Sequence, residues 1–214
     1  MSKYLIWGAG GHGKVVADTA RASGLEVAGF IDLDRNRMGE VVEPGGAQLT
    51  HPEEDFLASI VRGSLPDGID GIILAVGANT QRQRCRMLLP ENFLKTVVHP
   101  RAIVSGHAYI GPGSVVMPGA IINSAAYVGS GVLVNTGAIV EHDCNIGNDS
   151  HIAPQSVLAG RVTVGERVLV GAGAVIIPYI KVGSDAMIGA GSVVIRDVSE
   201  GITVAGNPAK MVTK

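Results

Sequence analysis

The sequence predicts an α/β domain at the N-terminus followed by a parallel β-helix. Two observations carry this prediction: a glycine-rich loop between an apolar strand and a helix, and an aliphatic residue at every sixth position from Val98 to Val194. A period of six fits neither a helix nor an ordinary strand, and hexapeptide repeats are typical of a parallel β-helix. We expect an N-terminal domain over 1–97, a β-helix over 98–199 and a C-terminal cap over 200–214.

The composition limits the class of protein. Hydrophobic residues make up 46% of the chain but aromatic residues only 4%, so branched aliphatic side chains and alanine must fill the core. A net charge of -2 gives no electrostatic reason to expect nucleic acid or an anionic membrane as partner. Two distant cysteines suggest neither a disulfide framework nor a metal site. The short apolar run over 4–7 ends at a glycine, so we expect no signal peptide, no membrane insertion and a cytoplasmic location.

The first 97 residues alternate between strand and helix patterns. The expected elements are strands over 3–7, 26–31 and 69–76, helices over 14–22 and 80–89, and a polar loop over 36–49. This alternation predicts a small parallel sheet of the Rossmann-like kind.

The loop after the first strand fits the pattern G-x-G-x-x-G through Gly8, Gly10 and Gly13. In such loops the glycines let backbone N–H groups approach a diphosphate at the start of a helix. Asp32 ends the second strand, where an acidic residue usually binds a ribose hydroxyl. Because the domain has only about half the strands of a full dinucleotide fold, a nucleotide diphosphate attached to something other than nicotinamide fits better than NAD. His12 either contacts this ligand or caps the loop.

The repeats predict which residues stack. Three hexapeptides make one triangular coil, so residues 18 apart lie above one another at a spacing of ~4.8 Å. One predicted inward column contains Val134, Ile152, Val170 and Ile188. A predicted turn column contains Ser124, His142, Gly160, Pro178 and Arg196.

The segment Glu141-His142-Asp143 is the one concentrated group of ionisable residues in the repeats. A carboxylate that fixes the tautomer of His142 makes it a candidate general base. Gly160, the next residue of the column, offers a backbone N–H that suits an oxyanion. We leave open whether Asp143 or Glu141 orients the imidazole.

The other histidines give weaker signals. His151 lies half a coil from His142, so the two are expected to meet only across a subunit interface. His51, His99 and His107 are expected at the surface. No set of three histidines converges within one chain, so we expect no metal.

Two late features suggest a ligand along the β-helix. Gly171-Ala172-Gly173-Ala174 and Gly189-Ala190-Gly191-Ser192 lie 18 residues apart, which predicts a smooth ridge for a long thin ligand. The segment 204–210 breaks the period and is expected to cover the last coil, as solenoids require.

Together, the repeats, the ending Gly206-Asn207-Pro208-Ala209-Lys210 and the loop Gly8-Ala9-Gly10-Gly11-His12-Gly13-Lys14 resemble a known family. It comprises the left-handed β-helix acetyltransferases that modify nucleotide-linked amino sugars for surface-glycan assembly, including the PglD and NeuD types and GDP-perosamine N-acetyltransferase. The resemblance covers essentially the whole chain.

This resemblance implies a homotrimer with active sites between subunits, acetyl-CoA as co-substrate in the groove between β-helices, and GDP-perosamine or a UDP-linked 4-amino sugar as acceptor. It implies that His142 is the base, supported by Asp143, and that Gly160 N–H binds the thioester carbonyl. The residues expected at the nucleotide sugar are Gly10, Gly11, His12, Gly13, Asp32, Asp34, Asn79, Asn135 and Glu141. The residues expected at acetyl-CoA are His151 (from the adjacent subunit), Gly160, Gly173, Ala174, Gly191, Pro208 and Lys210. Arg82 also matches a family position, without a defined role.

Three alternatives remain. A sialic-acid-type O-acetyltransferase would use the same base on a hydroxyl group. An NAD-dependent oxidoreductase would use the glycine loop but leaves the β-helix without a purpose. A non-catalytic trimeric scaffold would need neither ligand.

Overall fold

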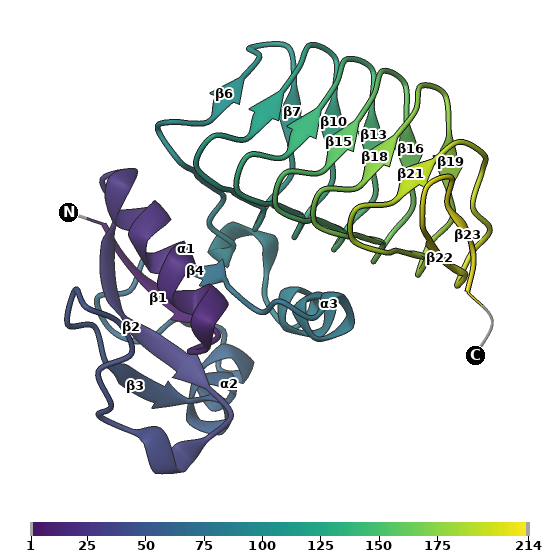
Figure 1. Ribbon diagram of the computed structural model, residues 1–214. Helices are drawn as coiled ribbons and strands as arrows, with labels where there is room; N and C mark the ends of the chain where they lie inside the picture. The colour runs from purple at the N-terminus through teal and green to yellow at the C-terminus, as the bar shows by residue number, and fades with distance from the viewer. Residues whose placement is uncertain (1, 213–214) are drawn as a thin grey trace.

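The computed structural model describes residues 2–212 and places a small α/β domain beside a long β-helix (Figure 1). The α/β domain has a four-stranded parallel sheet in the order β3-β2-β1-β4. Its strands are β1 (Lys3–Trp7), β2 (Glu26–Asp32), β3 (Leu49–Pro52) and β4 (Gly71–Leu74). Its helices are α1 (Gly11–Ala22), α2 (Glu53–Val61) and α3 (Asn79–Met87), with short 3₁₀ turns η1 (Arg35–Arg37) and η2 (Glu91–Phe93). This confirms the predicted α/β fold.

The sequence reading missed one βα unit. The expected polar loop over 36–49 begins within η1 and runs into β3, which is followed directly by α2. The strand β3 has only four residues, lies at the sheet edge and ends at Pro52. Such a short segment carries no alternating pattern from which to recognise it. The helix α1 also begins earlier than expected, inside the glycine loop.

Alternate residues of β1 enter two separate cores. Tyr4 and Ile6 pack with one face of α1, whereas Leu5 and Trp7 pack with α2 and α3 on the other face of the sheet. The first core continues into the β-helix through Val115, Met117 and Leu133. Apolar burial therefore joins the two parts of the chain along α1.

The β-helix consists of two-residue strands in which the predicted sixth-position residue is always the second. They are β5 (Val97–Val98), β6 (Ile103–Val104), β7 (Tyr109–Ile110), β8 (Val115–Val116), β9 (Ile121–Ile122), β10 (Tyr127–Val128), β11 (Leu133–Val134), β12 (Ile139–Val140), β13 (Asn145–Ile146), β14 (His151–Ile152), β15 (Val157–Leu158), β16 (Thr163–Val164), β17 (Leu169–Val170), β18 (Val175–Ile176), β19 (Lys181–Val182), β20 (Met187–Ile188) and β21 (Val193–Val194). These residues, with small ones four places later, form one core. The expected column pairs in register: Val134 with Ile152, Ile152 with Val170, and Val170 with Ile188.

The strands form three parallel sheets with different outer faces. The eight-stranded sheet, which runs from β5 to β20 in steps of three strands, faces the α/β domain. The six-stranded sheet from β6 to β21 presents an outer row that we call the aliphatic face: Ile103, Ile121, Ile139, Val157, Val175 and Val193. The five-stranded sheet presents Tyr109, Tyr127, Asn145, Thr163 and Lys181.

A left-handed residue at the turns lets the chain change direction between sheets. Three columns of positive φ, each at 18-residue spacing, contain many residues other than glycine, and Ala125, Asp143, Arg161 and Tyr179 form one of them. Their φ values lie between 58° and 68°. The Arg161 N–H donates to the His142 carbonyl of the previous coil at 2.9 Å, so the turns also bond along the axis.

The predicted cap segment extends a sheet before the chain ends. The strand β22 (Thr203–Ala205) pairs in parallel with β20, and β23 (Lys210–Met211) returns antiparallel to β22. The last two residues of the predicted cap lie outside the described residues.

We predict that Ile152→Ala lowers the free energy of unfolding by ~2–5 kcal/mol, because the side chain is 0% exposed and its loss leaves a cavity in the coil. Chemical denaturation of the whole protein measures this. The matched control is Val61→Ala, at a side chain that is 89% exposed, where the change should stay within ~0.5 kcal/mol. Equal losses in the two variants would contradict the assignment of Ile152 to the core.

Candidate active site

A cleft of about 370 Å³ opens at the carboxyl ends of the parallel strands. Its lining residues are Trp7, Gly8, Ala9, Gly10, Gly11, His12, Ile31, Asp32, Leu33, Glu53, Ala75, Val76, Gly77 and Gln81. The start of α1 lies in this cleft, so unbonded N–H groups and the positive end of the helix dipole favour an anion there. We call this the nucleotide cleft, after the ligand that the sequence predicts for the glycine loop.

The glycines of the loop divide into two kinds. Gly10 and Gly11 have open space where a side chain would begin, which leaves room for a ligand. Gly13 is buried, and a β-carbon there would collide with the Gly8 carbonyl. Gly13 was predicted to contact the nucleotide sugar, but it does not line the cleft. It allows α1 to pack closely against the loop.

The two acidic residues predicted to bind ligand after the second strand, Asp32 and Asp34, both accept hydrogen bonds from nearby backbone N–H groups. Asp32 lines the cleft, and its carboxylate accepts the N–H groups of Ala9 (2.9 Å) and Asp34 (3.2 Å). It therefore holds the glycine loop, while lone pairs remain for a ligand hydroxyl. Asp34 accepts from Asn36 N–H at 3.0 Å and caps η1. Asp34 does not line the cleft, which departs from the prediction.

The sequence reading missed Glu53, a buried carboxylate that lines the same cleft. It accepts from the Trp7 indole at 3.1 Å and pairs with Arg84 at 2.9 Å. Glu53 follows β3, so the missed strand also hid this residue. Recognition of β3 would have pointed to Glu53, because polar groups that follow parallel strands meet at one edge of the sheet.

His12 and His151 approach each other between the two parts of one chain. Their ring centroids are 6.4 Å apart, and His151 Nε2 lies 3.0 Å from Asn135 Nδ2. Burial, and then the Arg82 charge, lowers the pKa of His12 to about 4. Burial, followed by Arg82 and His12, lowers the pKa of His151 to about 4. Both imidazoles are therefore neutral at pH 7.

His142 has the geometry of a general base. Its Nδ1 lies 2.9 Å from Asp143 Oδ2, and donation from Nδ1–H leaves Nε2 as a free acceptor. Glu141 instead accepts from the His142 backbone N–H at 3.3 Å. Within this chain Asp143, not Glu141, orients the imidazole. The hydrogen bond from His142, then Arg161 at 3.4 Å, holds the pKa of Asp143 below its usual value.

Gly160 lies directly beside the His142 ring, as the turn column predicts. A β-carbon at Gly160 would lie 2.7 Å from His142 Cε1 and Nε2, so only glycine leaves the ring in place. The Gly160 carbonyl accepts from Tyr179 N–H at 3.2 Å. Within residues 2–212 the Gly160 N–H itself donates to no protein group. It is thus available to an oxyanion near His142 Nε2.

The residues expected at acetyl-CoA differ in their exposure. Gly173 and Gly191 are exposed turn residues with open space around them. Ala174 is 0% exposed in the core, its N–H bonds Gly171 (3.1 Å) and its carbonyl accepts from Val157 (2.8 Å). The prediction of a ligand contact for Ala174 is wrong, because no part of it reaches the surface. Pro208 and Lys210 are exposed in the terminal segment.

The predicted site residues fall on two sides of the β-helix. His142 and Gly160 lie at the corner between the six- and five-stranded sheets, whereas Asn135 lies at the corner between the eight- and six-stranded sheets. His151 projects from the eight-stranded sheet toward His12. The aliphatic face separates the two groups, so one chain does not bring them together. Asn79 lies elsewhere: its amide bonds Arg82 and Arg167 and does not line the nucleotide cleft.

Two negative observations apply to the described part of the chain. No three or more His, Cys, Asp or Glu side chains among residues 2–212 gather in a way that would hold a metal ion. Over the same residues, no helix has the length and apolar character needed to cross a membrane.

We predict that the free energy of unfolding falls between pH 6.5 and 4, by up to ~1.4 kcal/mol per pH unit for each buried histidine. Well above pH 6.5 His12 and His151 are neutral in both states, so they add no pH dependence. Below it the unfolded chain binds protons that the folded chain excludes until about pH 4. Denaturant unfolding at pH 5 and 7 measures this. A His12→Gln/His151→Gln variant should reduce the dependence, and exposed His107→Gln should leave it unchanged.

Comparisons with known proteins agree with the two-part fold. The family model for the PglD N-terminal domain matches residues 3–88, and the bacterial transferase hexapeptide model (six repeats) matches 161–196. UDP-N-acetylbacillosamine N-acetyltransferase of Bacillus subtilis (strain 168) is 38% identical over 118 residues, which span 54% of this chain and 51% of that protein. This match thus spans about half the length of the curated relative.

Two solved structures match nearly end to end. One is a histidine-to-asparagine mutant of perosamine N-acetyltransferase from Caulobacter crescentus in complex with CoA and GDP-perosamine, with 34% identity, 100% of this chain and 98% of that chain covered, and a TM-score of 0.90. The other is the acetyltransferase domain of PglB from Neisseria gonorrhoeae FA1090 in complex with acetyl coenzyme A, with 37% identity, 98% of each chain covered, and a TM-score of 0.84. This chain belongs to the family of left-handed β-helix, hexapeptide-repeat sugar N-acetyltransferases with a PglD-type N-terminal domain.

Proposed function

We propose that this protein transfers the acetyl group of acetyl-CoA to the amino group of a nucleotide-linked amino sugar, with His142 as general base. The observation that carries the proposal is the arrangement Asp143–His142–Gly160, in which a carboxylate orients an imidazole beside a free backbone N–H. This arrangement combines an acceptor nitrogen with a free backbone N–H at one exposed point.

The reaction follows from this geometry. The neutral sugar amine attacks the thioester carbonyl carbon, and His142 Nε2 takes a proton from the attacking nitrogen. The carbonyl oxygen becomes an oxyanion that Gly160 N–H stabilises. The C–S bond then breaks, and the CoA thiolate leaves with a proton from the imidazolium. Asp143 stabilises the imidazolium between these two steps.

The nucleotide cleft supplies the second half of the substrate complex. Gly10 and Gly11 at the start of α1 would bind the diphosphate through backbone N–H groups. Asp32 lies where it would accept from ribose. The related structures from Caulobacter crescentus, which contain CoA and GDP-perosamine, support a guanosine nucleotide with an amino sugar as the acceptor.

The active assembly is a homotrimer in this proposal. The six branched aliphatic side chains of the aliphatic face, with Ile103 65% exposed, form an apolar row that suits a self-association surface. Packing these faces around a threefold axis would bring the His142 corner of one chain toward the Asn135 corner of the next. Both groups of predicted site residues would then meet between subunits, with Gly173 and Gly191 beside them for CoA.

The test of function is thiol release from acetyl-CoA with GDP-, UDP- and CMP-linked 4-amino sugars, alongside the matching 4-hydroxy sugars. We expect turnover with an amino sugar and a drop of ~10²–10⁴-fold in kcat for His142→Asn, with trimer and ligand binding retained. The matched control is His107→Asn, an exposed histidine at the same corner two coils away, which should keep wild-type kcat. Turnover only with hydroxy sugars would indicate O-acetylation. No thiol release with any acceptor, or stabilisation by NAD but not acetyl-CoA, would contradict the proposal.

We predict that Val157→Asp separates the trimer, because a carboxylate in the middle of the aliphatic face would lose its hydration at a packed interface. Analytical ultracentrifugation should give about three times the chain mass of 22.0 kDa for wild type and a lower mass for the variant. The matched control, Thr163→Asp on the outer face of the five-stranded sheet, should remain trimeric. A monomeric wild-type protein with full activity would refute a site between subunits.

A further inference from the structure

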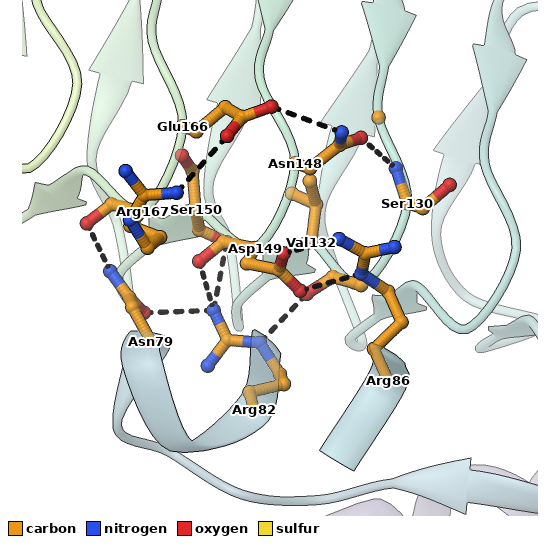
Figure 2. Close-up of polar contacts among 12 residues, drawn as sticks. Asn79, Arg82, Arg86, Ser130, Val132, Asn148, Asp149, Ser150, Glu166 and Arg167 are labelled. Atoms are coloured by element: carbon orange, nitrogen blue, oxygen red, sulfur yellow. Dashed lines mark hydrogen bonds and ion pairs between the residues drawn. The ribbon is translucent and has the colours of Figure 1, made fainter. Parts of the chain in front are cut away.

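One face of α3 contacts three successive coils of the β-helix (Figure 2). Asn79 and Arg82 lie one helical turn apart, and their side chains bind carbonyls of turn residues spaced 18 apart. The contacts are Arg82 Nε to Gly131 O (2.7 Å), Arg82 Nη2 to Asp149 O (2.6 Å) and Asn79 Nδ2 to Arg167 O (2.8 Å). Positive φ places Gly131, Asp149 and Arg167 in one turn column. These hydrogen bonds therefore fix the position of α3 along the axis of the β-helix.

Arg82 is the centre of this contact. Its side chain is 0% exposed, and its guanidinium bonds Val76 O (2.9 Å), Gly77 O (3.1 Å) and Asn79 Oδ1 (2.8 Å) in addition to the β-helix. Every partner that it bonds is a neutral oxygen. Because Val76 and Gly77 line the nucleotide cleft, Arg82 holds one wall of that cleft.

The other end of the same guanidinium reaches the strand that carries His151. Arg82 Nη2 bonds the carbonyls of Asp149 and Ser150, at 2.6 and 3.3 Å, immediately before His151 in β14. Arg86 adds a two-bond ion pair to the Asp149 carboxylate, at 2.9 and 2.7 Å, and that carboxylate is 0% exposed. One side chain thus connects the cleft wall to the backbone beside His151.

Simple attachment of the domain does not require these bonds. The core along α1 already joins the sheet to Val115 and Leu133 of the β-helix. Apolar contact is non-directional and would tolerate a shift along the repeating coils. Hydrogen bonds to backbone carbonyls would not tolerate a shift by a fraction of the ~4.8 Å coil spacing. The pair between Arg86 and the Asp149 carboxylate also distinguishes one coil from the next, because the equivalent turn residue one coil later is Arg167. The apolar contacts therefore attach the α/β domain to the β-helix, and the polar contacts fix its height along the coil axis.

We propose that Arg82 is a positioning residue for acetyl transfer: it fixes the nucleotide cleft relative to the β-helix so that the bound amino sugar reaches the acetyl group. This rests on the proposed function. Its loss should leave each ligand able to bind its own part of the protein while the two are held at the wrong separation. A misplacement of about 1 Å is enough to cost ~10²-fold in rate.

The test uses Arg82→Lys, which keeps the charge but cannot contact both sides, and Asn79→Ala, which removes only the third contact. We expect kcat to fall ~100-fold for Arg82→Lys and ~10-fold for Asn79→Ala. Nucleotide affinity, followed by fluorescence of the single Trp7 in the cleft, and CoA affinity, followed by calorimetry, should stay within about twofold of wild type. The matched control is Arg62→Met, an exposed arginine after α2, with wild-type kcat expected.

Three results would overturn the proposal. Wild-type kcat in both variants would remove the positioning role. A loss of nucleotide affinity equal to the loss of kcat in Asn79→Ala would make Asn79 a substrate contact instead. A crystal structure of Asn79→Ala with the His12–His151 ring separation unchanged from 6.4 Å and with reduced kcat would exclude displacement as the cause. If Arg82→Lys does not fold, Asn79→Ala and Arg86→Gln carry the same test. An inactive wild-type protein would contradict the proposed function. The His12–His151 ring separation in the variants would still test whether Arg82 positions the domain.

Discussion

Stacking of inward aliphatic residues every 18 positions is the constraint on which the other features of this structure depend. Each coil is closed by turns whose left-handed residues bond to the coil before, as Arg161 N–H does to His142 O. Because the period never slips, side chains and carbonyls at equivalent turns lie in straight columns. The His142–Gly160 pair comes from one column, and the carbonyls that Arg82 binds come from another. A single repeat therefore sets up both the geometry of the candidate site and the placement of the domain.

Three histidines of the candidate site occupy two different environments: His142 is exposed, whereas His12 and His151 are enclosed. His142 is exposed, touches a carboxylate and keeps one ring nitrogen free, so it can exchange protons with a substrate. His12 and His151 are enclosed between the domains near the positive charge of Arg82, and this lowers both pKa values to about 4. Neutral rings there add no positive charge to repel an incoming amine.

The sequence predicts the position of a residue well where the residue belongs to the hexapeptide repeats, and poorly where it lies outside them. The period was enough to place His142 beside Gly160, and it also marks Ala174 as inward, four places after Val170. The ridge interpretation of Gly171–Ala174 overlooked that rule, and the buried Ala174 corrects it. Beyond the repeats, β3 was too short to show a pattern and its Glu53 was missed with it. Asn79 was assigned to substrate on resemblance alone, because no local pattern reveals that its amide bonds a turn 88 residues away.

The regular coil also limits where a substrate can be covered. No loop is inserted between β5 and β21, so the β-helix itself has nothing to fold over the exposed His142. In the proposed trimer, material from outside the coil would provide a low-dielectric site, namely the neighbouring subunit and the nucleotide cleft. Both must be held at a fixed height along the axis, since the repeating surface offers equivalent positions one coil apart. The hydrogen bonds of Arg82 to backbone carbonyls exclude intermediate heights, and the pair between Arg86 and the Asp149 carboxylate selects one coil, so that the parts are held in one geometry.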